Sequence, residues 1–245
     1  MQVHPTSVDV QADATPLRED IQSLWRAFEP LPFDLRRRAL RLGEITAVDA
    51  GEPFAPEGEI AVVLSGCLLL HVGQSTVCAG VAAASDLVDL GGGSNGRWLT
   101  SGTLYRAPLS SFLHEAGDEG LRFLLSAEVR RMHALEMRLV CAMAHPALSR
   151  VASLLLEMDQ ACDGADVRLC QAAIGEMLSL RRTSVNGACQ TLRSARAIRT
   201  VRGRTVVLDR ALLASYVCCK RLETVETPTN PEETMQEVVA QSAAA

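Results

Sequence analysis

Seven arginines between residues 171 and 208 are the side chains of this chain best suited to bind a ligand, and only one acidic residue, Glu176, accompanies them. They are Arg181, Arg182, Arg193, Arg196, Arg199, Arg202 and Arg204. A guanidinium group donates paired hydrogen bonds to phosphate oxygens and to the edge of guanine. The cluster therefore favours an anionic partner, above all a nucleic acid.

The apolar residues of the same stretch predict the elements that hold these arginines. Ile174 and Leu178 lie four residues apart on a first helix, and Val185, Cys189 and Leu192 have the spacing of a second. Each helix can bury one face and leave its polar face free. Two short helices, a tight turn and a basic hairpin are typical of a winged helix-turn-helix that binds duplex DNA.

Charge is divided unequally along the chain. Residues 147–222 carry 12 basic and 6 acidic side chains, whereas the rest carries 12 basic and 23 acidic ones, within a net charge of −5. A basic unit joined to an acidic one can hold its phosphate-binding face towards DNA. With 48% apolar residues, the chain is expected to be globular.

Nothing in the sequence indicates an enzyme, a cofactor or a metal site. The five histidines accompany no nucleophile motif, and there is no Walker loop or dinucleotide fingerprint. The eight cysteines lack metal-ligand spacing, so we expect reduced thiols in a cytoplasmic protein. No run of eighteen apolar residues predicts a membrane span.

The N-terminal half is expected to contain a small sheet with helices before it. We expect residues 1–15 to be disordered and residues 16–117 to form one domain. It begins with a helix near Pro16, whose apolar face carries Leu17, Ile21, Leu24 and Phe28, and continues with a helix from Asp34, its N-cap, to Leu42. Between Ile45 and Pro108, short apolar runs separated by glycines predict a rolled antiparallel sheet.

A long helix is predicted over residues 118–144, after a short one capped by Ser110 or Ser111. Its apolar positions alternate four and three apart, as in a two-stranded coiled coil: Leu121, Leu125, Glu128, Met132, Leu135, Leu139 and Ala142. A helix of about 40 Å cannot bury this whole seam on a small sheet, which favours pairing with a second copy. The alternative is one amphipathic helix packed on its own domain. Glu128 would need Arg131 or a cation of the partner copy beside it.

His145 and Pro146 end that helix, because proline cannot continue the hydrogen-bond ladder. Residues 145–222 are therefore predicted to form the DNA-binding domain, with a helix from Leu148 to Gln160 and a short strand at residues 167–169. Residues 223–245 are acidic, poor in large apolar groups and expected to be disordered.

This order of parts resembles the Crp-Fnr family of transcription regulators. The similarity is most specific in AAIGEMLSLRRTSVNGACQTLRSARAI, in RGRTVVLDR and in HPALSRVASLLLEM, and it covers about residues 17–220. It implies an α+β fold with an N-terminal cyclic-nucleotide-binding-like β-roll (jelly roll), a long dimerisation helix and a C-terminal winged helix-turn-helix.

The resemblance also implies which residues contact DNA. Arg182 stands where family members place an arginine that binds guanine, whereas Thr183 and Gly187 replace the glutamate and the second arginine of many relatives. Arg181 and Asn186 are possible substitutes for these base contacts. Thr183 and Ser184 are placed for phosphate contacts, and the wing arginines, Arg199, Arg202 and Arg204, for the backbone or the minor groove.

The stretch DLVDLGGGSNGRWLTS departs from the cyclic AMP cassette of the family, which has a Gly-Glu pair and an Arg-Ser pair. Arg97 stands where the phosphate-binding arginine would, but Trp98 follows it and no Gly-Glu pair precedes it. We therefore expect no cyclic AMP in the usual pose. Gly92 and Gly93 are candidates for holding an anion together with Arg97, or they form only a turn. The iron-sulfur type of the family needs N-terminal cysteines, and the first here is Cys67.

The resulting hypothesis is a homodimer that binds duplex DNA at a roughly palindromic site, with RNA polymerase as a further partner and an unknown effector. Two alternatives stay open. In the first, the chain is a protein-interaction module that antagonises or partners another regulator. In the second, it senses another anionic second messenger near Arg97.

Overall fold

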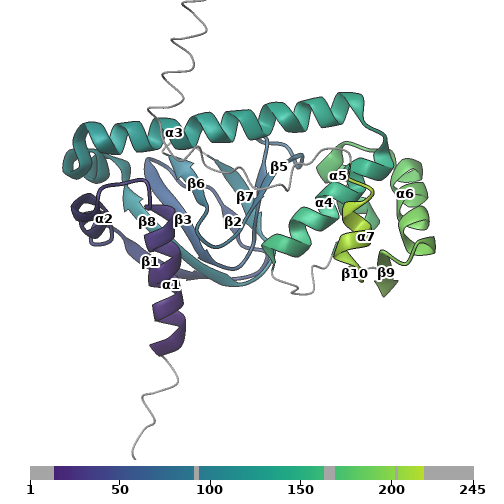
Figure 1. Ribbon diagram of the computed structural model, residues 1–245, viewed down its shortest axis with the longest axis horizontal. Coiled ribbons are helices and arrows are strands. Elements are labelled where there is room, and N and C mark those ends of the chain that lie inside the picture. The colour runs from purple at the N-terminus through teal and green to yellow at the C-terminus, as the bar shows by residue number, and fades with distance from the viewer. Residues whose placement is uncertain (1–13, 91–93, 163–168, 202–203, 218–245) are drawn as a thin grey trace, which may run out of the picture.

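The computed structural model describes residues 14–90, 94–162, 169–201 and 204–217. Figure 1 shows a β-roll at one end, a smaller helical domain at the other, and the long helix α3 running alongside both. The predicted fold class, a β-roll followed by a long helix and a winged helix-turn-helix, is confirmed. No described helix, not even the 36-residue α3, combines the length and apolarity that a membrane span requires.

The roll consists of two four-stranded antiparallel sheets. One has the order β1-β8-β3-β6 and the other β2-β7-β4-β5. The strands are β1 (Glu44–Val48), β2 (Pro53–Phe54), β3 (Glu59–Ser65), β4 (Leu68–His71), β5 (Cys78–Ala82), β6 (Leu87–Leu90), β7 (Asn95–Trp98) and β8 (Gly102–Pro108).

Strand β3 is buried on both faces, which explains its continuous apolar run. Ile60, Val62 and Leu64 belong to the core shared with the helices, whereas Ala61 and Val63 belong to the core inside the roll. This alternation follows from the two-residue period of a strand. The roll is therefore a filled core with a helical cover on one side.

Helices α1 (Ala14–Ala27) and α2 (Phe33–Ala39) form that cover together with the start of α3. Phe28 is its centre, with ring centroids 5.8 Å from Phe123 and 6.0 Å from Phe112. Leu24 and Phe28 are buried as predicted, but Ile21 is 47% exposed. The predicted cap of the second helix is wrong: Pro32 is the N-cap, and Asp34 lies in the first turn, where its charge suits the helix dipole.

Helix α3 (Leu109–Ala144) is interrupted at Gly117, whose φ of 53° is not helical. The glycine lies between the short helix and the long helix that the sequence predicts. Pro108 is the N-cap, so the predicted serine cap is wrong. The helix ends at His145, which is extended, and Pro146 is the N-cap of α4 (Ala147–Ala161).

The C-terminal domain contains α5 (Gln171–Leu178), α6 (Arg182–Ser194), the hairpin β9 (Ile198–Val201) and β10 (Arg204–Val207), and α7 (Arg210–Ala214). Asp209 caps α7 by accepting a 2.8 Å hydrogen bond from the Leu212 amide. The core of this domain also contains Leu69 and Cys78 of the roll, so the two domains share one continuous apolar cluster. Of the predicted strand at residues 167–169, only Leu169 lies within the described residues, and it is not in a strand.

Candidate nucleic-acid interface

Helices α5 and α6 pack through their apolar faces, as their spacing predicts. Ile174, Val185, Cys189 and Leu192 are at most 1% exposed. Burial raises the pKa of the Cys189 thiol, which therefore stays protonated and serves as a small apolar group. The packing turns the polar face of α6 outward.

The turn between the two helices is tight and depends on small side chains. Ser179 has the left-handed conformation, with φ 50° and ψ 46°, and the Leu180 amide donates a 2.9 Å hydrogen bond to the Gly175 carbonyl. A side chain at Gly175 would place its Cβ 3.2 Å from the Leu180 carbonyl oxygen. Glycine thus lets the turn pass close to α5 and fixes the angle between the helices.

The N-terminal end of α6 carries the predicted reading residues on its surface. Arg181, Arg182, Thr183 and Asn186 are exposed, and Ser184 is half-buried. Arg181 is the N-cap, and no side chain caps the first turn. The first amide groups and the positive end of the helix dipole are thus available to a phosphate beside the guanidinium groups.

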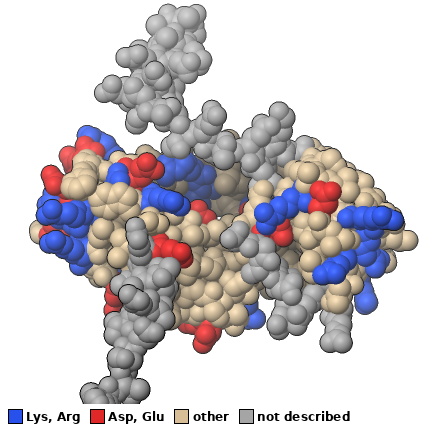
Figure 2. Space-filling model, turned by 60° about the horizontal axis from the view of Figure 1, so that its bottom comes forward, with Lys and Arg blue, Asp and Glu red and all other residues tan. Residues whose placement is uncertain are grey.

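Arg181 and Arg182 form no ion pair with any carboxylate in the part of the chain described. Figure 2 shows Lys and Arg side chains gathered at the end of the molecule that carries α6, with little acidic surface among them in this view. These cations are therefore unneutralised and available to an anionic ligand.

The hairpin β9–β10 forms the wing, with Arg199 opposite Val206. Arg199 is exposed. Arg202 and the side chain of Arg204 lie outside the described residues, although the backbone of Arg204 pairs with Val201. The hairpin is tied to the chain that follows α6 by Ala197, whose carbonyl accepts the Leu208 amide at 2.9 Å.

Helix α3 exposes a stripe of apolar side chains between the roll and the hinge. Large members are Leu121, Leu125, Val129, Met132, Leu139, Val140 and Met143, between 48% and 81% exposed. Four residues of the predicted seam belong to this exposed stripe: Leu121, Leu125, Met132 and Leu139. Leu135 and Ala142 lie at its side, because a straight helix repeats every 3.6 rather than 3.5 residues. Together with Leu139 they line a cavity.

Glu128, the polar member of the predicted seam, is paired within its own helix. Arg131 donates hydrogen bonds of 2.8 and 2.6 Å to the two carboxylate oxygens. These bonds hold the pKa of Glu128 below its ordinary value. The carboxylate is therefore neutralised without a second chain.

In the roll, Arg97 and Trp98 point to opposite sides of β7. Arg97 is exposed, whereas Trp98 is 2% exposed and packs inside the roll with Val48, Phe54 and Leu68. Burial and the charge of Arg97 lower the pKa of His71, which keeps this imidazole neutral at pH 7. Gly92 and Gly93 lie outside the described residues, and no group of three or more metal-ligating side chains occurs among the described ones.

Sequence reasoning missed two features. Val129, Val140 and Met143 of the exposed stripe would have been found with a 3.6-residue period in place of the heptad. Arg138 and Arg150, which line one cavity between the two domains, come from different helices, and no local signal joins them.

The chain thus combines a β-roll with a helix-turn-helix domain, and α6 exposes arginines at its N-terminal end. Residues 149–216 match the Crp-like helix-turn-helix domain. No curated protein sequence shows a significant match to the chain. Similarity that extends over both domains is therefore seen in the comparison with solved structures.

Three solved structures share the fold along most of their length. A regulator of the crp/fnr family from Eubacterium rectale has a TM-score of 0.62 and 14% identity, covering 77% of this chain and 96% of its own. FixK2 from Bradyrhizobium japonicum has a TM-score of 0.58 and 18% identity, covering 72% and 98%. A CRP/FNR regulator from Thermus thermophilus has a TM-score of 0.58 and 16% identity, covering 71% and 97%.

The C-terminal part of the chain therefore carries a Crp-like helix-turn-helix domain, and the chain as a whole shares the fold of crp/fnr regulators.

Proposed function

We propose that this protein is a cytoplasmic homodimer that reads a roughly palindromic DNA site with two α6 helices and regulates transcription together with RNA polymerase. The observation that carries this proposal is the exposed, unneutralised N-terminal end of α6, with Arg182 in its first turn. A helix entering the major groove with these residues leading can place a guanidinium on guanine O6 and N7.

The remaining contacts divide by chemistry. Arg182 is the proposed base reader, with Asn186 and Arg181 as further base contacts. Thr183, Ser184 and the free amides of α6 hold phosphates. Arg199, Arg202 and Arg204 reach the backbone or minor groove from the wing. Because most of these contacts are ionic, we expect affinity to fall steeply as salt rises.

The proposal predicts that Arg182→Ala removes sequence selectivity. Loss of one bidentate guanine contact should cost about 1–3 kcal/mol in each half-site. A fluorescence anisotropy competition between operator and random duplexes measures it. Arg37→Ala, an exposed arginine on α2 at the other end of the molecule, is the matched control and should bind as the wild type does. Unchanged selectivity in Arg182→Ala would remove Arg182 as reader, and a wild-type protein that binds no duplex would favour the protein-interaction alternative.

The dimer is proposed to form along the exposed stripe of α3. An apolar stripe this continuous on one helix is unusual for a free surface, and pairing would bring two α6 helices to about one DNA turn, ~34 Å, apart.

We expect Leu125→Glu to convert the dimer to a monomer, because it buries a charge in the apolar seam. Sedimentation measures the change. Ala134→Glu is the control, since Ala134 is exposed and lies nine residues, two and a half turns, from Leu125. A Leu125→Glu protein that stays dimeric would place the interface elsewhere.

We further propose that the roll does not take cyclic AMP in the usual pose. Trp98 supports this, since its indole occupies the interior of the roll. An anionic ligand near Arg97 stays a separate possibility on the outer side of β7.

A further inference from the structure

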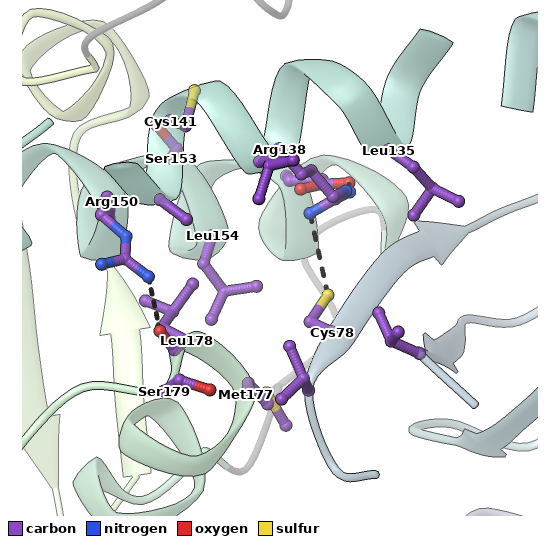
Figure 3. A pocket seen from close by; sticks show the side chains of 15 residues that line it. Cys78, Leu135, Arg138, Cys141, Arg150, Ser153, Leu154, Met177, Leu178 and Ser179 are labelled. Carbon is purple, nitrogen blue, oxygen red and sulfur yellow. Dashed lines mark hydrogen bonds and ion pairs between the residues drawn. The ribbon is translucent and has the colours of Figure 1, made fainter. Parts of the chain in front are cut away.

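A cavity of about 350 Å³ lies where the roll, the long helix and the helix-turn-helix meet (Figure 3). Its walls come from the β4–β5 hairpin, the end of α3, one face of α4 and the end of α5. Its lining includes Val77, Leu135, Arg138, Arg150, Leu154, Glu157 and Met177. The volume falls within the usual range of small-molecule sites, about 300–1000 Å³.

Most of this wall is apolar. Val77, Leu135 and Leu154 line it beside Met177 and Leu178. Such a wall favours an aliphatic or aromatic body, because each buried methylene contributes about 0.8 kcal/mol.

One of the two arginines in the wall is already engaged. Arg138, with a side chain only 17% exposed, forms an ion pair with Glu157, and its Nη1 donates to the Cys78 sulfur at 3.8 Å. Its Nε–H is buried without a partner. Arg138 and Glu157 therefore neutralise each other.

The second arginine is not neutralised. Arg150 donates one hydrogen bond of 2.5 Å to the Leu178 carbonyl, and no carboxylate among the described residues pairs with it. Figure 3 shows Arg150 at the opposite end of the cavity from Arg138. Two arginines against one glutamate give the wall a surplus positive charge next to its apolar surface.

We propose that this cavity binds a small amphipathic monocarboxylate, whose carboxylate pairs with Arg150 and whose apolar body lies against Leu135, Leu154 and Met177. Arg150 joins α4 to the end of α5, directly before Ser179 in the turn of the helix-turn-helix. A carboxylate at Arg150 competes with the Leu178 carbonyl for its donors. The helix-turn-helix then has two arrangements, one with the Arg150–Leu178 bond and one without it. A ligand that binds one of them more tightly shifts the balance between them and thereby changes the affinity for DNA.

The test uses sodium octanoate as the probe and octan-1-ol as its uncharged counterpart, with full-length dimeric protein. We expect saturable octanoate binding by calorimetry, a higher Tm and a changed affinity for operator DNA. Octan-1-ol should bind at least about tenfold more weakly, since a hydrogen-bonded charge pair is worth that factor or more.

Three variants locate the site. Val77→Phe fills the cavity from the hairpin, away from α6 and from the exposed stripe, and should abolish binding of both probes. Arg150→Gln should lose about tenfold in octanoate affinity with no change for octan-1-ol, and Arg150→Lys should restore the preference for the acid. The Tm and DNA binding of each variant without probe verify its fold.

The proposal is overturned if the wild type shows no saturable octanoate binding, which is also the result expected if a side chain of the second copy fills the cavity. It is equally overturned if a folded Val77→Phe protein binds octanoate normally, which would place the probe on the exposed stripe of α3. Equal octanoate affinity of Arg150→Gln and wild type would overturn it as well. DNA binding by the apo protein is measured separately, so that failure here leaves the proposed function standing.

Discussion

Arginines lie at both ends of the molecule, interspersed with acidic side chains at the end away from α6, and the two ends use them differently (Figure 2). At the end formed by α2 and the start of α3, Arg36 donates to the carbonyls of Glu29 and Leu31 and lies over the Trp25 ring at 4.6 Å, while Arg38 pairs with Glu115. At the α6 end, Arg181 and Arg182 have no such carboxylate partners among the described residues. Arg36 and Arg38 are engaged within the fold, whereas Arg181 and Arg182 remain available to an anionic ligand.

The interiors of the two domains differ as well. The side chains that α5 and α6 bury are apolar, among them Ile174, Met177 and Leu192, and the proposed DNA contacts lie on the surface. The roll encloses the large indole of Trp98 in its core. Three experiments test these contrasts beyond those proposed above.

The largest effect is expected for Trp98→Ala. Emptying the core of the roll should lower the free energy of unfolding by about 3–5 kcal/mol. Arg97→Ala, the neighbouring exposed position, should change it by no more than about 0.5 kcal/mol. Chemical denaturation measures both, and cyclic AMP should leave the Tm of the wild type unchanged. A small loss in Trp98→Ala, or a rise in Tm with cyclic AMP, would mean that the interior is a ligand site rather than a core.

An intermediate effect is expected for Arg106→Ala, in the roll. Arg106 donates to one oxygen of Glu59 through Nε at 2.8 Å and through Nη2 at 2.5 Å, in a pair that is partly exposed. Its loss should lower the free energy of unfolding by about 1 kcal/mol and leave DNA affinity intact. Arg182→Ala should instead weaken selective DNA binding and leave the free energy of unfolding nearly unchanged. A DNA defect in Arg106→Ala would contradict the division between structural and free arginines.

The smallest effect is expected for Glu128→Gln. The hydrogen bond from Arg131 lowers the pKa of Glu128 from 4.5, so the pair stabilises the protein above pH 4.5 and loses this contribution as the pH falls through the lowered pKa. For a partly exposed pair we expect about 0.2–1 kcal/mol at pH 7. Thermal unfolding of both proteins at pH 7 and at acidic pH measures it. A difference that grows as the pH falls would contradict the assignment.

The sequence by itself determined the local elements and the charge of the DNA-binding surface. Val185, Cys189 and Leu192 specify which face of α6 is buried, because helical periodicity is a local property. Once that face is buried, Arg182 and Asn186 must be outside. Glycine and apolar runs likewise specified the strands of the roll, although not which two sheets they form, since strand order depends on pairings between distant residues.

Only the tertiary structure decided features built from distant segments. The predicted caps at Asp34 and Ser110 failed because backbone entry from Pro32 and Pro108 set the helix starts. The seam of α3 divided into an exposed stripe and a cavity wall, because α4 and the β4–β5 hairpin cover one side of that helix. Arg138 meets Glu157 and Arg150 meets Leu178 only after the hinge at Pro146 folds α4 back against α3. Contacts of this kind depend on the packing of whole elements, and no spacing along the chain encodes them.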